Sequence, residues 1–153
     1  MAVYSRILLA VDLSPESLLI GHRARALAEA LDGELEIVSV VEPIPIVAPI
    51  PPDTVVPVIV TKQAELVDAA QQHISLLAQE LGVPDTNWRV IVGNIKSEIT
   101  RVAVDNKVNL IVIGSRERHG LAFLIKPTED VLVHRAPCDV LAVRLTEQQE
   151  QQD

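Results

Sequence analysis

Two short apolar runs in this chain are each followed directly by residues that could do chemistry. Asp12 follows Ile7–Val11, and Gly114 and Arg116 come directly after Leu110–Ile113. Glycine lets backbone amides approach phosphate oxygens, and arginine pairs with anions. Asp12 suits a ligand contact and equally suits a hydrogen bond to the amides of its own turn. These two places are therefore the ones to examine for a bound ligand.

Nucleophilic catalysis is less well supported. Cys138 lies four residues after His134, but Pro137 separates them and the cysteine begins an apolar strand. Burial raises the pKa of a thiol and makes it inert, so Cys138 is predicted to be structural. Ser14 is predicted to cap a helix rather than to act as a nucleophile, because Pro15 follows it directly.

The histidines point to no catalytic or metal site. His22 and His73 lie on predicted helices beside charged neighbours and are expected at the surface, whereas His119 lies in a loop over the presumed ligand cleft. No histidine cluster has metal-ligand spacing, and no carboxylate or nucleophile stands at a spacing that identifies a catalytic pair. We therefore predict no catalytic residues, no metal and no enzymatic activity.

The elements that position these residues are strands alternating with helices. Fully apolar runs indicate strands covered on both faces, and apolar residues at helical spacing indicate the helices between them. The second predicted helix carries Leu66, Ala70, Ile74, Leu77 and Leu81 on one face. Strands are predicted at Ile7–Val11, Leu35–Val41, Trp88–Val92, Leu110–Ile113 and Val140–Val143, with a last helix over Glu129–His134. This alternation predicts an α/β fold with a doubly wound parallel sheet, which binds ligands at the carboxyl ends of its strands.

The segment 42–60 breaks the pattern. It holds six of the chain's ten prolines, interleaved with isoleucine and valine. Proline removes an amide donor and fixes φ, so a loop packed on the body or on a partner is predicted here. Residues 1–146 are predicted to form one domain and residues 147–153 a polar tail.

Composition excludes several classes of function. The net charge is −8, so the chain lacks the electrostatic footprint for duplex DNA or anionic membranes. One tyrosine, one tryptophan and one phenylalanine are too few for base-stacking platforms. No targeting or membrane-spanning stretch is apparent, and a single cysteine forms no intrachain disulfide. We expect a cytoplasmic protein that binds no nucleic acid and no membrane.

The chain resembles the universal stress protein family along almost its whole length, in four stretches. The opening Ile7–Ser14 is similar to the family's first strand and its V-D-x-S turn, and Leu110–Arg116 is similar to the fourth strand and its exit glycine. The segments 118–122 and 136–143 are similar to the family's closing segments. The resemblance implies a five-stranded sheet in the order 3-2-1-4-5 and a homodimer joined along the fifth strand, residues 138–144.

One branch of that family binds ATP through the pattern G-x2-G-x9-G-[S/T]. Gly114 matches the first glycine, Glu117 and Pro127 stand where the second and third should be, and Thr128 matches the last position. An ungapped match puts Lys126 and Pro127 at the last pair instead, and two of three glycines are missing in both alignments. The nearby cations Arg116, Arg118, Lys126 and His119 could still hold an anion. The loss of several amide donors together outweighs them, so we predict a degraded phosphate site.

The resemblance leaves two functions open. The first is a non-catalytic stress-response regulator that acts as a homodimer through protein interactions, with no cofactor. The alternative is an ATP or AMP switch, with Mg²⁺, that uses the cleft between the first and fourth strands. For that alternative, the resemblance implies binding residues at Ala10, Asp12, Val40, Ile113, Gly114, Arg116 and Thr128.

Overall fold

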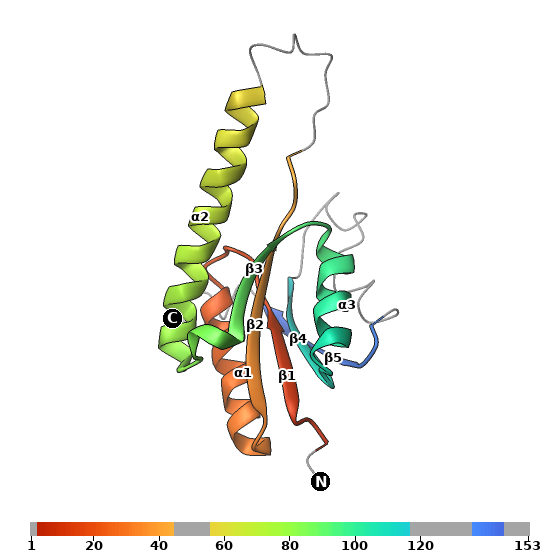
Figure 1. Ribbon diagram of the computed structural model, residues 1–153. Helices are drawn as coiled ribbons and strands as arrows, with labels where there is room; N and C mark the ends of the chain where they lie inside the picture. The colour runs from red at the N-terminus through yellow and green to blue at the C-terminus, as the bar shows by residue number, and fades with distance from the viewer. Residues whose placement is uncertain (1–2, 45–55, 117–135, 146–153) are drawn as a thin grey trace.

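The protein is described by a computed structural model that places residues 3–44, 56–116 and 136–145 (Figure 1). The strands are β1 (Arg6–Ala10), β2 (Glu34–Val41), β3 (Trp88–Val92), β4 (Leu110–Arg116) and β5 (Asp139–Leu145). The helices are α1 (Ser17–Leu31), α2 (Val56–Leu81), α3 (Ile95–Asp105) and the short 3₁₀ turn η1 (Asp85–Asn87). The predicted helix over residues 129–134 and the tail 147–153 lie outside the described residues.

All neighbouring strands are parallel, and their order is β3-β2-β1-β4-β5. The predicted order is therefore confirmed. β1 lies at the centre, with Leu9 opposite Ile37 of β2 on one side and opposite Val112 of β4 on the other. The winding direction reverses between β1 and β4, which is where open α/β sheets bind ligands.

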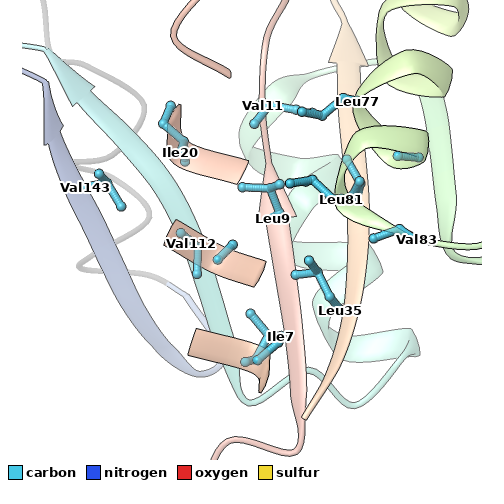
Figure 2. Close-up of a cluster of buried hydrophobic side chains, with 14 of the residues drawn as sticks. Ile7, Leu9, Val11, Ile20, Leu35, Leu77, Leu81, Val83, Val112 and Val143 are labelled. Atoms are coloured by element: carbon cyan, nitrogen blue, oxygen red, sulfur yellow. The ribbon is translucent and has the colours of Figure 1, made fainter. Parts of the chain in front are cut away.

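Two apolar layers cover the sheet. Alternate residues of β1 face opposite sides, so Ile7 and Leu9 pack with α1 and α2, and Leu8 and Ala10 pack with α3 (Figures 1 and 2). This two-sided burial explains why β1 reads as a continuous apolar run rather than as an alternating one.

The helix α2 departs from the sequence prediction at its amino end. It begins at Val56, inside the segment predicted to be a loop up to Val60. Pro57 is its second residue, where the missing amide has no helical carbonyl to bond. Leu66 was predicted on the buried face but is 41% exposed, because α2 extends past the sheet (Figure 1). The deeper positions from Ala70 to Leu81 are buried as predicted.

The turn between β1 and α1 also differs from the prediction. α1 begins at Ser17, so the predicted capping of this helix by Ser14 is wrong. The Ser14 amide instead donates to Asp12 Oδ1, and the Ser14 carbonyl accepts from the Ser17 amide. The polar groups of Ser14 are thus satisfied within the turn, three residues before the helix starts.

Candidate functional site

The apolar part of the predicted site forms where β1, β2 and β4 end. Ala10, Val40 and Ile113 belong to the layer that faces α3 and pack in the same cluster. Ala10 and Ile113 are buried, whereas Val40 is half-buried. The structure therefore brings these three residues together as an apolar floor at the carboxyl edge of the sheet.

Asp12 is the predicted polar residue nearest to that floor in sequence. It is exposed, and its Oδ1 accepts a hydrogen bond of 2.9 Å from the Ser14 amide. This confirms the local role of an aspartate that stabilises its own turn. Asp12 therefore places an exposed carboxylate two residues after Ala10, the last residue of β1.

Gly114 has a packing role that sequence reasoning missed. A Cβ added to it would lie 2.4 Å from Ile20 Cδ1 of α1 and 3.4 Å from Leu145 Cδ1 of β5. This direction points to the α1 side of the sheet, away from the floor formed by Ala10, Val40 and Ile113. The glycine therefore leaves room for the Ile20 side chain where α1 packs on β4, whatever contact its backbone makes with a ligand.

Of the remaining predicted site residues, the structure describes only Arg116. Arg116 is the last residue of β4 and lies opposite Leu145 of β5. Thr128 lies outside the described residues, as do Glu117, Lys126 and Pro127 of the phosphate pattern and both His119 and His134.

The entry to α3 adds polar groups that the sequence analysis did not single out. The Gly93 amide donates to the Val41 carbonyl at 3.0 Å, which fixes the turn to the end of β2. Asn94 caps α3 by accepting from the Ser97 amide at 3.1 Å, and Ile95 packs on the same layer as Val40. An asparagine directly before an apolar helical repeat is the signal that could have predicted this cap.

A buried serine–histidine pair joins α1 to α2. His73 was predicted at the surface, but it is half-buried and its Nε2 lies 2.8 Å from Ser17 Oγ. Ser17 is only 2% exposed, so no substrate reaches its hydroxyl and the pair serves as a link between the two helices.

Cys138 has the properties of a structural cysteine. It is half-buried and packs against the α3-side layer. Burial, followed by the negative charge of Asp139, raises the pKa of its thiol above the ordinary value. A raised pKa lowers the thiolate fraction at neutral pH, which agrees with the predicted inert role.

The part of the chain that the structure describes contains neither a metal-binding cluster nor a helix that could span a membrane. Within residues 3–44, 56–116 and 136–145, no three histidine, cysteine or acidic side chains are arranged to hold a metal ion. None of the helices in the described part of the chain combines the length and apolar character of a membrane span.

Comparisons with known proteins agree with this architecture. Universal stress protein A homolog 1 of Coxiella burnetii is 30% identical over 144 residues, which cover 94% of this chain and 99% of that protein. The universal stress protein UspA of Lactobacillus plantarum has a similar fold, with a TM-score of 0.73 at 22% identity, covering 92% of this chain and 98% of the other.

A further solved structure is a universal stress protein in complex with cAMP, with a TM-score of 0.61 at 23% identity, covering 92% of this chain and 96% of the other. The profile of the universal stress protein family itself matches residues 3–144. With the parallel sheet, its strand order and the Asp12 turn in place, this match is decisive: the chain belongs to the universal stress protein family.

Proposed function

We propose that the protein is a non-catalytic, cytoplasmic stress-response regulator that works as a homodimer joined along β5 and acts through protein interactions. The open edge of β5 is the observation that carries this proposal. β5 is the last strand in the sheet order, and among the described residues it pairs with β4 alone.

The chemistry of that edge favours pairing with a second copy. Leu141 is 41% exposed and Ala142 is also exposed, and neither proline nor an inward-facing charge interrupts Asp139–Leu145. An exposed, uninterrupted strand edge is a template for another strand. Antiparallel pairing about a two-fold axis would satisfy both edges with one self-complementary contact.

Light scattering on the full chain at micromolar concentration tests the dimer. Successive backbone amides of a strand point to opposite edges. Leu141→Pro and Ala142→Pro therefore remove amides on different edges: one variant loses a donor on the open edge (the outward variant), and the other loses a donor to β4 (the inward variant). We expect the outward variant to halve the mass and keep its melting temperature, and the inward variant to melt earlier. A monomeric wild-type protein, or two proline variants that both keep the dimer mass, would refute the proposal.

Nucleotide binding is the second candidate, and a specific arrangement favours it. Val40 is the half-buried member of the floor and would contact a base, while the exposed carboxylate of Asp12, two residues after Ala10 in the chain, would accept from a hydroxyl or amino group. The similar structure with cAMP supports a ligand that carries one phosphate. The missing glycines of the phosphate pattern argue against a triphosphate.

A thermal shift series with cAMP, AMP and ATP–Mg²⁺ tests this candidate. A ligand at a hundred times its Kd stabilises the fold by about 2.7 kcal/mol. Asp12→Asn is the matched variant, because it keeps an acceptor for the Ser14 amide and removes only the charge. We expect cAMP or AMP to shift the wild-type melting temperature and to shift that of Asp12→Asn less. Absence of a shift with all three would exclude the nucleotide hypothesis.

If only the triphosphate fails to bind, the variant Glu117→Gly, Pro127→Gly gives the reason. Restored glycines should improve ATP binding, because they return directed amides to the loop. If binding does not improve, the lost glycines are not what prevents it.

A further inference from the structure

A side chain from the segment before β1 reaches the edge strand of the sheet. The Tyr4 hydroxyl donates a hydrogen bond of 2.7 Å to Oδ2 of Asp139, the first residue of β5. β1 and β5 are not neighbours, because β4 lies between them. Leu110, the first residue of β4, lies opposite Ile7 of β1 on one side and opposite Asp139 on the other. The Tyr4 side chain therefore crosses the amino end of β4 and connects two strands that do not pair with each other.

The backbone beside Tyr4 is held by two neighbouring elements. The Glu34 amide, at the start of β2, donates to the Ser5 carbonyl at 2.8 Å. Asn109, directly before β4, accepts from the Arg6 amide at 3.0 Å and donates to Ser5 Oγ at 3.1 Å. Tyr4 itself is half-buried and packs against the layer that faces α1 and α2. The Tyr4 hydroxyl is therefore carried on a fixed part of the chain when it bonds to β5.

The two halves of β5 are held differently on the side of the sheet that faces α1. Val143 and Leu145 are buried and belong to the core that packs with α1 and α2. Side chains alternate along a strand, so Asp139 and Leu141 lie on this same side. Both of them are exposed. On this side, burial therefore anchors the carboxyl half of β5, and the hydrogen bond from Tyr4 anchors the amino half.

The other side of β5 gives its amino half only partial cover. Cys138 and Val140 pack against the layer that faces α3, but both are half-buried, and Ala142 is exposed. Partial burial restrains a strand less than full burial does, so a directed hydrogen bond at its first residue adds to what fixes its position.

We propose that Tyr4 is a positioning residue for the β5 interface, because its hydrogen bond to Asp139 holds the amino half of β5 in the conformation that pairs with a second copy. This inference rests on the proposed β5 dimer. Antiparallel pairing about a two-fold axis lays the amino half of each β5 along the carboxyl half of the other. Each dimer therefore contains two Tyr4–Asp139 hydrogen bonds, one at each end of the paired edge. A strand half that is already ordered loses less conformational entropy when the two copies associate.

Tyr4→Phe tests this role, because it removes the hydroxyl and keeps the ring in the layer beside α1. We expect the Kd of the dimer, measured by light scattering over a dilution series, to rise about tenfold, since a loss of about threefold in each copy enters twice. The matched control is Thr86→Val. It removes another exposed hydroxyl, the donor to Asn87 Oδ1, directly before β3 at the opposite edge of the sheet. This control should keep the wild-type Kd.

Two further measurements follow the hydrogen bond itself. The chain has one tyrosine, so its phenolate absorbance reports on Tyr4 alone. Donation to Asp139 is the largest cause that raises the pKa of the Tyr4 hydroxyl, so the phenolate of Asp139→Ala should form at a lower pH than that of the wild type. At a dilution where both proteins are monomers, Tyr4→Phe should speed deuterium exchange of the amides that pair residues 139–142 with β4. Exchange at residues 143–145 should stay as in the wild type.

A double variant separates the hydrogen bond from other effects of the two side chains. Asp139→Ala should also raise the Kd of the dimer, and adding Tyr4→Phe to it should change the Kd little further, because both substitutions remove the same bond. Full additivity of the two changes would contradict the proposal.

The outcomes distinguish this inference from the dimer on which it rests. A wild-type protein that stays monomeric refutes the β5 dimer and the role of Tyr4 together. A dimeric wild type whose Kd is unchanged in Tyr4→Phe overturns the role of Tyr4 alone and leaves the β5 dimer standing. The same holds if the tyrosine titrates identically in the wild type and in Asp139→Ala.

Discussion

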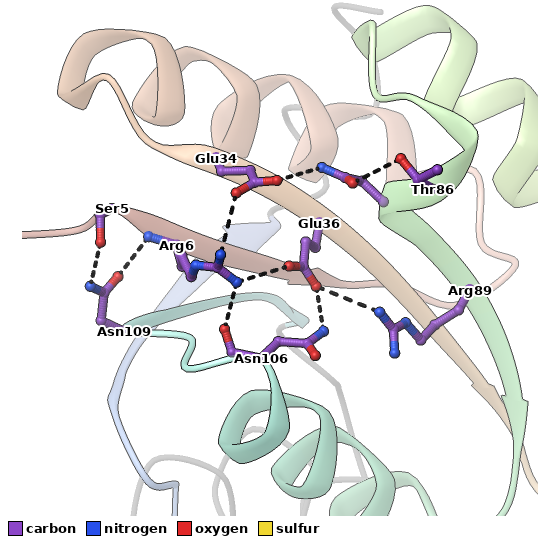
Figure 3. Close-up of polar contacts among 9 residues, drawn as sticks. Ser5, Arg6, Glu34, Glu36, Thr86, Arg89, Asn106 and Asn109 are labelled. Atoms are coloured by element: carbon purple, nitrogen blue, oxygen red, sulfur yellow. Dashed lines mark hydrogen bonds and ion pairs between the residues drawn. The ribbon is translucent and has the colours of Figure 1, made fainter.

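The two ends of the parallel sheet differ in their polar chemistry. At the amino ends of the strands, Glu36 of β2 is held by three side chains from other elements (Figure 3). Asn106 Nδ2 donates to its Oε2 at 2.6 Å, and the guanidinium groups of Arg6 and Arg89 lie 4.0 and 3.9 Å from its carboxylate oxygens. Arg6 also donates to the Asn106 carbonyl. This network joins β1, β2 and β3 to the end of α3.

At the carboxyl ends, the side chains of Asp12 and Asn94 bond within their own turns, and the contact between elements is made by backbone groups such as the Gly93 amide and the Val41 carbonyl. Asp12 bonds to the amide two residues away, and Asn94 bonds to the first turn of its own helix. Between them lies the apolar floor of Ala10, Val40 and Ile113. The comparison indicates that the amino end joins several elements through side chains, whereas at the carboxyl end Asp12 and Asn94 each stabilise the turn in which they lie.

The largest expected effect breaks packing at the carboxyl end. Gly114→Ala should destabilise the protein by about 3 kcal/mol, because its Cβ would lie 2.4 Å from Ile20 Cδ1. Urea denaturation measures the change. Ile20→Val removes that Cδ1, so the double variant should lose much less than the sum of the two single variants. If the effects of the two single variants simply added in the double variant, the Cβ at position 114 would not clash with Ile20 Cδ1.

Breaking the amino-end network comes next. Glu36→Ala removes the acceptor of the Asn106 amide and the carboxylate that pairs with Arg6 and Arg89, although Arg6 keeps the Asn106 carbonyl and Glu34 as partners. It should cost about 2 kcal/mol, less than a fully buried pair because both guanidinium groups are nearly half exposed. Glu36→Gln keeps an acceptor for Asn106 and should cost about half as much. If Glu36→Ala is as stable as wild type, the network does not stabilise the sheet and the comparison fails.

The matching change at the carboxyl end should cost less. Asp12→Ala removes one exposed hydrogen bond to the Ser14 amide and should lower the free energy of unfolding by about 1 kcal/mol. Asp12→Asn retains the acceptor and should be close to wild type. If Asp12→Ala lowered the free energy of unfolding more than Glu36→Ala in the same urea series, the carboxyl end and not the amino end would be the one that stabilises the sheet.

The smallest effect is a pH dependence at the amino end of β5. Burial raises the pKa of the Cys138 thiol, so alkylation by iodoacetamide should continue to accelerate at a pH where the urea-unfolded chain has reached its plateau. The sign for stability follows. The raised pKa contributes stability that is complete below the unfolded-state pKa and is lost as the pH rises through the folded-state value. Identical profiles for folded and unfolded protein would contradict the burial.

Apolar runs were sufficient to predict the strands, because a strand buried on both faces requires them. Leu110–Ile113 lies in the observed β4, and all four of its residues are buried. The start of α2 was not predictable in this way, since Pro57 and the β-branched residues around it favour an extended chain. His73 was misplaced because its partner, Ser17, is 56 residues away, and helix-to-helix register is not visible in local spacing.

The site was only partly predictable for the same physical reason. Asp12 and the apolar floor follow from where parallel strands end, which the strand–helix alternation determines. Glu36 was not singled out, because its partners come from three other elements and no local pattern marks them. Gly114 was interpreted through a phosphate pattern, whereas its contact with Ile20 depends on the approach of α1, which only the structure reveals.

The length of α2 has a consequence for how its amide hydrogens exchange with solvent. Its carboxyl-terminal turns, from Ala70 to Leu81, are buried against the sheet and α1, while its amino-terminal turns extend beyond both (Figure 1). Isolated helical turns are marginal in water, so amide hydrogens near Leu66 should exchange with deuterium by local fraying, and those near Ile74 only when the domain opens as a whole. One continuous helix would thus contain two classes of amide protection, and a partner that covered the amino-terminal turns of α2 would slow exchange in the first class before it affected the second.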